Sequence, residues 1–373
     1  MNKIQQYNMI LETVSPIHIA SGNTLNTTQY LYDRAAGKVH FVDEQAWIKF
    51  LNERDLLGKF ESFVTSSEKG FLYRWLVENK VKEKEMQDFI IGSASVSVDT
   101  RESWHEIATN ISSVNDKQYI PGSSIKGALR TAILYAFIRK DKDLRERYWR
   151  EIKSLGYGLK KDLERLANKL EKEILYKLDS NKKNATAIVN DSMRGLRVSD
   201  ARLIDKNLET LLVNKIDVVN MGNNGETKEK EIPTYRECFP LKTKLEFEIT
   251  IDPLLLNKIG IKDIKQILTM SSLFTQNSLQ QLQKGFHQDF YAIDNGYEQA
   301  NIMLGGGAGF IGKSLLYALA PNEEAGREIV KKALPFPKHK HELLDKIISP
   351  RTLKTCKIRG AQYVMGLGCI KEK

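Results

Sequence analysis

The sequence has few cysteines and no long apolar run, and both absences narrow the class of protein. Only three cysteines occur among 373 residues. They are far apart and never spaced as CxxC, so neither a disulfide framework nor a zinc site is expected. The longest apolar run, Ala132 to Ile138, has seven residues, against the roughly 20 that span a bilayer. The opening segment lacks the apolar core of a signal peptide. We therefore expect a soluble, cytoplasmic protein that does not bind membranes.

Proline and glycine are also scarce, with 9 and 24 residues, and no stretch is compositionally biased, which excludes fibrous and disordered classes. Lysine and arginine number 57 against 47 acidic residues, a net charge of +10. The excess is concentrated, because residues 331–373 hold 11 basic and 3 acidic side chains and residues 139–183 hold 15 and 9. Such basic faces predict a polyanionic partner such as nucleic acid, although basic helical surfaces also occur in proteins that bind nothing.

Hydrophobic periodicity in the first third of the chain predicts strands around one helical block. Apolar residues alternate after Tyr7, as in a half-buried strand that ends at Ser15-Pro16. Asp43 stands where a helix N-cap is expected. The predicted elements are a strand over 7–19, a hairpin over 30–42, helices from 43 to 89, and a strand over 94–98.

The rest of the chain mixes helices and strands, with two insertions. A helix is predicted from Ile125 to Phe137, and leucines at spacings of three and four predict a helical subdomain inserted at about 139–185. The segment Asn220 to Glu231 is too polar to pack, so residues from about 213 to 238 are expected to form an exposed hairpin or mobile loop. Further strands are predicted over 197–203 and 242–251, and helices over 261–284, 314–320 and 323–333. This order indicates an α+β chain, with two sheet-and-helix units that meet near Pro240.

A glycine-rich motif, Gly307-Ala-Gly-Phe-Ile-Gly312-Lys313-Ser314, satisfies the GxxxxGK[ST] pattern of P-loop NTPases. A P-loop domain also needs an acidic residue at the end of an apolar strand to hold Mg²⁺. The 59 residues after Ser314 contain no such strand, so ATPase activity is not favoured. A glycine-rich turn can nevertheless bring main-chain N–H groups close to phosphate oxygens. An RNA backbone would supply such phosphates.

A second phosphate cradle is suggested by the segment from Pro121 to Arg130. Ser123 or Ser124 is placed to cap a helix, and Lys126 and Arg130 are four residues apart on one helical face. The alternative is an ordinary capped helix with two solvated cations.

The histidines offer little catalytic chemistry. His18 follows the first strand near Ser21-Gly22 and could act as a general acid or base, although a lone histidine is more often structural. His339 and His341 have no carboxylates at ligand spacing, so no metal site is predicted. Asp33 is better explained by a hairpin turn than by catalysis.

Four segments together resemble the RAMP superfamily of CRISPR-Cas RNA-binding proteins, and within it the fifth Csm-type subunits of type III-A effector complexes. The resemblance runs from residue 7 to residue 368, and its most specific part is IPGSSIKGALR. The segments are Ser15 to Gly22, Ile120 to Arg130, Gly305 to Ser314, and Gly366-Leu367-Gly368.

The resemblance implies an RNA-recognition-motif-like (ferredoxin-like) core with inserted helical and hairpin elements, in one unit over 1–240 and a second, with Gly-rich loops, over 241–373. It implies a subunit without a catalytic residue or cofactor that holds the 3′ region of a guide RNA, contacts neighbouring RAMP backbone subunits and supports guide maturation, with host nucleases as further partners. Residues 213–238 would be the hairpin that interrupts the guide–target duplex. The residues expected at RNA are His18, Gly122, Ser123, Ser124, Lys126, Arg130, Gly305, Gly306, Gly307, Gly309, Lys313 and Arg359. The competing interpretation is a metal-independent RAMP endoribonuclease with His18 as general acid or base.

Overall fold

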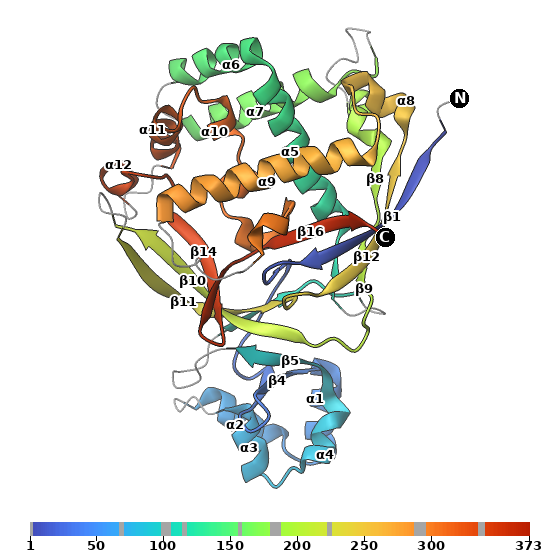
Figure 1. Ribbon diagram of the computed structural model, residues 1–373. Helices are drawn as coiled ribbons and strands as arrows, with labels where there is room; N and C mark the ends of the chain where they lie inside the picture. The colour runs from blue at the N-terminus through green and yellow to red at the C-terminus, as the bar shows by residue number, and fades with distance from the viewer. Residues whose placement is uncertain are drawn as a thin grey trace.

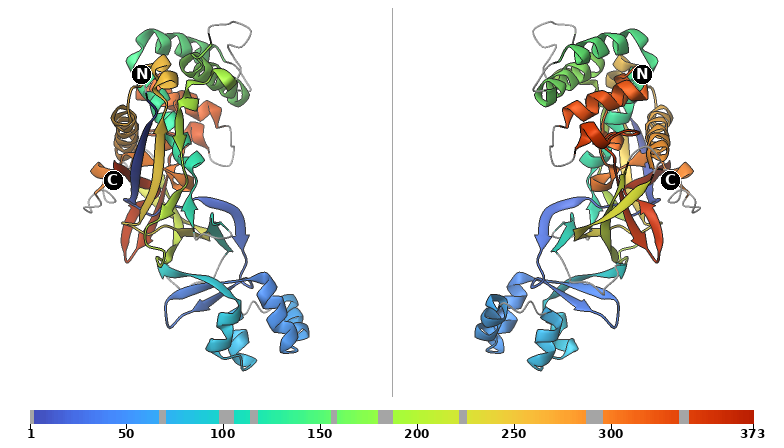
Figure 2. Two further views of the ribbon diagram at one scale, coloured as in Figure 1. Left: turned by 90° about the vertical axis from the view of Figure 1, so that its right-hand side faces the viewer. Right: turned by 90° about the vertical axis from the view of Figure 1, so that its left-hand side faces the viewer.

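The strands of the protein form two sheets, and a layer of helices covers the first of them (Figure 1). A small helical lobe extends from the second sheet, so the molecule is elongated in side view (Figure 2). This computed structural model describes residues 3–66, 71–97, 106–113, 118–155, 159–179, 188–221, 226–286, 296–334 and 340–373.

The first sheet is built around β1 (Gln5–Thr13). Met9 and Leu11 are fully buried, whereas Asn8 is exposed and Ile10 half-buried, because alternate side chains of a strand point to opposite faces. β1 pairs antiparallel with β12 (Lys244–Ile251) on one side and with β16 (Leu367–Glu372) on the other. The order is β13-β16-β1-β12-β9-β7, with β8 also beside β12. The remaining bounds are β7 (Tyr119–Ile120), β8 (Leu196–Val198), β9 (Ala201–Leu203) and β13 (Ile302–Met303).

Two long helices, α5 (Gly122–Lys140) and α9 (Ile264–Phe286), share one core with the inward face of this sheet. Ile125 of α5 and Ile267 of α9 are fully buried there, beside residues of β1 and β12. The rings of Tyr135 and Phe274 join the two helices, with centroids 5.0 Å apart. The short helix α8 (Pro253–Leu256) follows β12 directly.

A second helical core contains the helices of the segment predicted as an insertion. α6 (Lys142–Ser154) and α7 (Leu159–Leu175) pack against α10 (Leu316–Leu319) and α11 (Glu323–Ala333). Tyr148, Leu170 and Val330 are buried between them. Residues 156–158 and 180–185 of the predicted insertion lie outside the described residues. The short helix α12 (His341–Leu344) follows α11.

The second sheet contains the predicted hairpin, formed by β10 (Thr210–Asn220) and β11 (Thr227–Cys238). Its base is embedded rather than exposed, because Val213, Ile216 and Val218 are buried and β10 also pairs with β5 and β14. Residues 226–231 are exposed, and 222–225 lie outside the described residues. The sheet order is β2-β6-β11-β10-β5-β4-β3, with β14 on β10 and β15 on β14. The bounds are β2 (Ala20–Leu25), β3 (Tyr30–Asp33), β4 (Lys38–Val42), β5 (Ile90–Ser97), β6 (Glu106–Asn110), β14 (Thr352–Ile358) and β15 (Ala361–Val364).

The lobe next to β3, β4 and β5 consists of α1 (Glu44–Glu53), α2 (Leu57–Thr65), α3 (Leu72–Glu78) and α4 (Glu83–Met86). Aromatic side chains fill it, and the rings of Trp47 and Phe89 lie 4.8 Å apart. The predicted N-cap is confirmed, since Asp43 accepts a hydrogen bond from the Ala46 amide at 2.7 Å.

The strand pairing crosses the boundary expected near residue 240. β1 pairs with β12 and β16 in the first sheet, and β10 pairs with β14 in the second. Residues 1–240 and 241–373 therefore share both sheets. Two predicted elements are also corrected: the strand over 197–203 is split by a turn into β8 and β9, and the helix over 314–320 is reduced to α10.

Candidate nucleic-acid interface

The glycine-rich loop that follows β13 rests on the main chain of His18. Gly305 has a φ of +70°, and a Cβ at this position would lie 2.0 Å from the His18 carbonyl oxygen. The next amide, that of Gly306, donates a hydrogen bond to the same oxygen at 3.1 Å. Only glycine permits both the left-handed conformation and this close approach. The structure thus brings together His18 and the loop, two of the predicted site segments.

Gly306 is exposed and leaves space beside the guanidinium of Arg236, on β11. A Cβ at position 306 would lie 2.8 Å from Arg236 Nη1. This nitrogen is buried, and within the described part of the chain it has no hydrogen-bond partner. A buried donor on a cation is costly when unpaired, and an anion is the partner that a guanidinium binds best.

Lys215 and Lys313 lie close enough to this guanidinium for its positive charge to lower their pKa, and Lys354 shares the carboxylate of Asp217 with Lys215. Lys354 contacts Asp217 at 2.8 Å and Lys215 contacts the same carboxylate at 3.4 Å. Burial, followed by the positive charges of Lys354 and Arg236, lowers the pKa of Lys215 to about 8. Burial, followed by the charge of Arg236, also lowers the pKa of Lys313. We call Lys215, Arg236, Lys313 and Lys354 the cation cluster; its excess positive charge favours a bound polyanion.

Close packing or backbone conformation explains why the other positions of the loop are occupied by glycine. A Cβ on Gly307 would lie 2.5 Å from that of Met365. Gly309 has φ of 65° and ψ of −166°, a region that is essentially restricted to glycine. These residues shape the turn, whereas Gly306 is the one that faces the cation cluster.

The loop does not have the architecture of a P-loop. β13, which precedes it, pairs antiparallel with β16, and the helix after Lys313 has only four residues, Leu316–Leu319. A P-loop instead connects a strand to a long helix whose N-terminus faces the phosphates.

His18 is 3% exposed, and its Nδ1 lies 2.7 Å from the Glu237 carbonyl oxygen. Burial lowers the pKa of His18 to about 4, and the charge of Arg236 acts in the same direction. The ring is therefore neutral near pH 7. Among the described residues, the ring has no carboxylate as a hydrogen-bond partner, and its bond to the Glu237 carbonyl holds it as a structural element beside the loop.

The second predicted cradle is organised differently from the expectation. A carboxylate already occupies the start of α5, because the Gly122 amide donates to Asp200 Oδ1 at 2.8 Å. A Cβ on Gly122 would lie 2.2 Å from the Val198 oxygen. The cap predicted from Ser123 or Ser124 is wrong, since Pro121 is the N-cap residue and both serines lie inside the helix.

The two cations of this helix also differ from each other. Arg130 donates to Asp191 at 2.8 Å and to Glu171 at 3.0 Å through Nε, so its guanidinium is used inside the fold. Lys126 is half-buried, and burial lowers its pKa. Arg359 is exposed in the turn between β14 and β15, with a φ of +49°. It lies on a different turn from the glycine-rich loop.

Sequence reasoning missed Arg236, Lys215 and Lys354. Arg236 and Lys215 lie in the predicted hairpin, and Lys354 lies in the basic C-terminal segment. They lie in three strands, and β14 meets the other two only in the folded sheet, so no local motif marks them. Within the described residues, no group of three or more potential metal ligands occurs, and no helix there has the length and apolarity to cross a membrane.

The sequence matches the model of the RAMP superfamily over residues 10–282. This chain belongs to the RAMP superfamily. It also resembles the CRISPR system proteins named Csm5. The relative from Streptococcus thermophilus is 27% identical over 262 residues, which cover 67% of this chain and 65%, just under two thirds, of the relative. The relative from Enterococcus italicus is 26% identical over 355 residues, covering 87% of this chain and 83% of the relative.

Solved structures show the same fold. A chain of a Csm–crRNA–target RNA ternary complex from a type III-A CRISPR-Cas system aligns with a TM-score of 0.69 and 18% identity, covering 98% of this chain and 100% of that chain. The crystal structure of T. onnurineus Csm5 aligns with a TM-score of 0.63 and 16% identity, covering 96% and 99%. At these identities the likeness concerns the fold. The match to the RAMP superfamily model confirms the family expected from the sequence motifs.

Proposed function

We propose that this protein is a non-catalytic RNA-binding subunit of a type III-A CRISPR effector complex. In this role it caps the 3′ region of the guide RNA, contacts neighbouring RAMP subunits and supports guide maturation in the cytoplasm. The resemblance to Csm5 proteins and the alignment with a chain of a Csm–crRNA–target RNA complex support the proposal. The exposed end of the β10–β11 hairpin is the candidate element for interrupting the guide–target duplex.

The first sheet has the connectivity that a ferredoxin-like core would require. Four of its strands, taken across the sheet, are β16, β1, β12 and β8. In chain order they read fourth, first, third and second, with α5 between the first and second and α9 between the third and fourth. All these pairs are antiparallel. This order supports assigning the sheet and its two helices as the RNA-recognition-motif-like unit.

The observation that carries the proposal is the unpartnered Arg236 Nη1 beside Gly306, within a cluster of four cations and one carboxylate. RNA phosphate oxygens over the exposed Gly306 would lie beside the positive charge of this guanidinium, and a shift of the loop would let them pair with the buried Nη1. Contacts of this kind are made to the backbone, so binding would tolerate different sequences and weaken with salt.

The test is the affinity for labelled single-stranded RNA across a salt series. About four phosphate contacts give roughly a fifty-fold loss of affinity between 50 and 200 mM salt. Arg236→Gln should weaken binding and reduce the slope of log K against log salt by about 0.7. Its melting temperature should not fall, because the variant removes an unpaired buried donor. Arg74→Gln, on the exposed surface of α3, is the control and should bind as the wild type does. Wild-type affinity and slope in Arg236→Gln would reject the cluster as the RNA site.

Incubating repeat-spacer RNA with the purified protein in the absence of metal distinguishes the proposed binding function from the endoribonuclease alternative. We expect no products. Discrete fragments that a folded His18→Ala variant forms about 100-fold to 10,000-fold more slowly would establish the nuclease instead. In cells, loss of the protein should leave guides untrimmed at the 3′ end while 5′ processing continues. This outcome would support the capping role and the recruitment of a host nuclease.

A further inference from the structure

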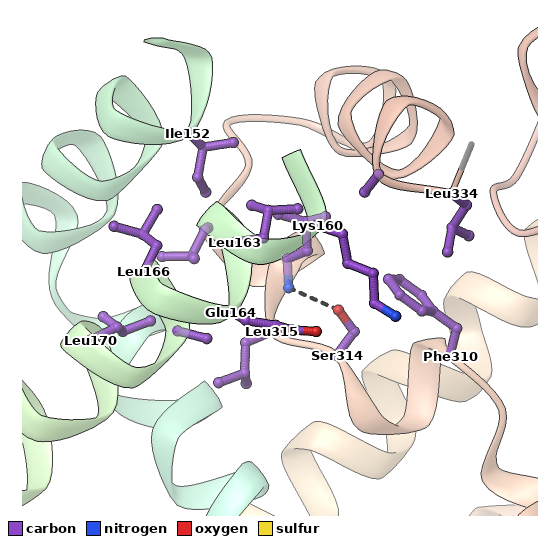
Figure 3. A pocket seen from close by; sticks show the side chains of 14 residues that line it. Ile152, Lys160, Leu163, Glu164, Leu166, Leu170, Phe310, Ser314, Leu315 and Leu334 are labelled. Carbon is purple, nitrogen blue, oxygen red and sulfur yellow. Dashed lines mark hydrogen bonds between the residues drawn. The ribbon is translucent and has the colours of Figure 1, made fainter. Parts of the chain in front are cut away.

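An apolar cavity of about 290 Å³ lies between α7, α10 and the end of α11 (Figure 3). Its walls are largely leucine side chains from α7 and α10, together with Phe310. Leu166 and Leu170 are buried, whereas Phe310 is half-buried and Ala167 is exposed at the surface. The cavity is thus a compact hollow with an entrance from solvent.

The polar side chains that line the cavity are Lys160, Glu164 and Ser314. Lys160 supplies donors and Glu164 acceptors, and both are exposed. Ser314 Oγ accepts a hydrogen bond from the Leu316 amide at 3.2 Å, which leaves its hydroxyl proton available to a ligand. Apolar walls with one aromatic ring and a few donors and acceptors suit a nucleobase, which stacks on its faces and hydrogen-bonds along its edge.

The cavity is lined in part by the chain segment that also contains the loop facing the cation cluster. Phe310 and Ser314 belong to the same segment as Gly306 and Lys313, so a backbone held at the cluster would place an adjacent base near Phe310. A volume of about 290 Å³ lies just below the usual range for drug-sized ligands, which matches one base rather than a longer segment.

We propose that this cavity binds a single unstacked nucleobase of the RNA whose phosphates contact the cation cluster. The inference rests on the proposed RNA-binding function. Stacking against Phe310 and burial among leucines provide the affinity, and Lys160, Glu164 and Ser314 contact the edge of the base.

The test uses short single-stranded RNAs with 2-aminopurine at one position in turn, bound to the full-length protein. One position should brighten on binding, because the probe fluoresces more strongly when it leaves its stacked neighbours. Ala167→Trp, which fills the entrance without removing a core side chain, should abolish this signal and weaken binding by about 10-fold with the salt slope unchanged. Phe310→Leu, which keeps apolar volume but removes the ring, should also reduce the signal. Asn168→Trp places the same side chain one residue along α7, does not line the cavity, and should behave as the wild type.

The outcomes separate this inference from the function on which it rests. RNA binding that is salt-sensitive but shows no position-specific signal, or a signal unchanged by Ala167→Trp, rejects the base site alone. A wild-type protein that binds no RNA rejects both. If Ala167→Trp leaves the signal intact but prevents assembly with a neighbouring subunit, the cavity is a protein-docking site and the base assignment is wrong.

Discussion

The carbonyl oxygen of His18 accepts a hydrogen bond from the amide of Gly306 at 3.1 Å. This contact fixes the glycine-rich loop on the segment that leaves β1, so two regions at opposite ends of the chain form one surface. The imidazole of His18 points into the fold, toward the Glu237 carbonyl. His18 therefore positions the loop through its main chain.

Gly305→Ala should destabilise the protein more than an ordinary glycine substitution does. The new Cβ would lie 2.0 Å from the His18 oxygen at a φ of +70°, so overpacking and backbone strain combine to a loss of about 2 to 4 kcal/mol. Chemical denaturation measures this loss. The control is Gly127→Ala on an exposed face of α5, where no atom lies within 4 Å, and it should stabilise the protein by about 0.5–1 kcal/mol. Equal stability of the two variants would contradict the close approach of the loop to His18.

His18 should make the protein less stable as the pH falls through the range below its ordinary pKa of 6.5. Because burial lowers the pKa of His18 to about 4 in the folded state, protons bind the unfolded chain first between pH 6.5 and 4. The contribution of neutral His18 to the free energy of unfolding is fully present above pH 6.5. About 2 kcal/mol of this free energy should be lost between pH 7 and pH 5. His18→Gln should show a smaller loss over the same interval in denaturation experiments. A parallel pH dependence in both proteins would mean that His18 is not held neutral.

Local sequence signals predicted individual helices and strands. The arrangement of the strands in the two sheets depends instead on pairing between distant segments. The hairpin of β3 and β4, the Asp43 cap and the helical insertion follow from turn residues and periodicity. The pairing of β1 with β16 depends on contacts between the two ends of the chain, which no short pattern encodes. This long-range pairing is also why a boundary at residue 240 does not divide the sheets.

The sequence alone indicated the glycine residues of the candidate site but not most of the cations of the cluster. The glycines at 305, 306, 307 and 309 cluster in one motif because a tight turn needs them together. Arg236 and Lys354 come into one sheet only because β11 and β14 both pair with β10. Arg130 shows that a cation predicted at the RNA can instead be used inside the fold. Its helical spacing suggests a free guanidinium, but the structure places Glu171 and Asp191 beside it.

Arg130→Gln should therefore lower stability and have little effect on the salt dependence of RNA binding. Its guanidinium pairs with Asp191 and Glu171 in a partly buried position, and its removal leaves two carboxylates without their partner, at a cost of about 1–3 kcal/mol. Lys126→Gln, one turn earlier, removes a half-buried cation with no ion pair among the described residues and should change stability by less than about 0.5 kcal/mol. Thermal melts and RNA titrations of both variants distinguish the roles. A normal melt and a flattened salt slope in Arg130→Gln would restore it to the RNA interface.

Lys215 should make RNA affinity depend on pH on the alkaline side of neutrality. Burial and the neighbouring cations lower the pKa of Lys215 to about 8, so it is mostly charged at pH 7 and mostly neutral at pH 9. A bound phosphate favours the charged form and raises this pKa. A rise of one unit in the pKa of Lys215 on binding predicts about a fivefold weaker RNA affinity at pH 9 than at pH 7.

Lys215→Arg keeps its charge across this range and should remove the pH dependence. Lys142→Arg, on the exposed face of α6, should retain the wild-type behaviour. If Lys215→Arg loses affinity between pH 7 and 9 as steeply as the wild type does, Lys215 does not sense the RNA, and the anion site must be limited to Arg236 and Lys313 beside the glycine-rich loop.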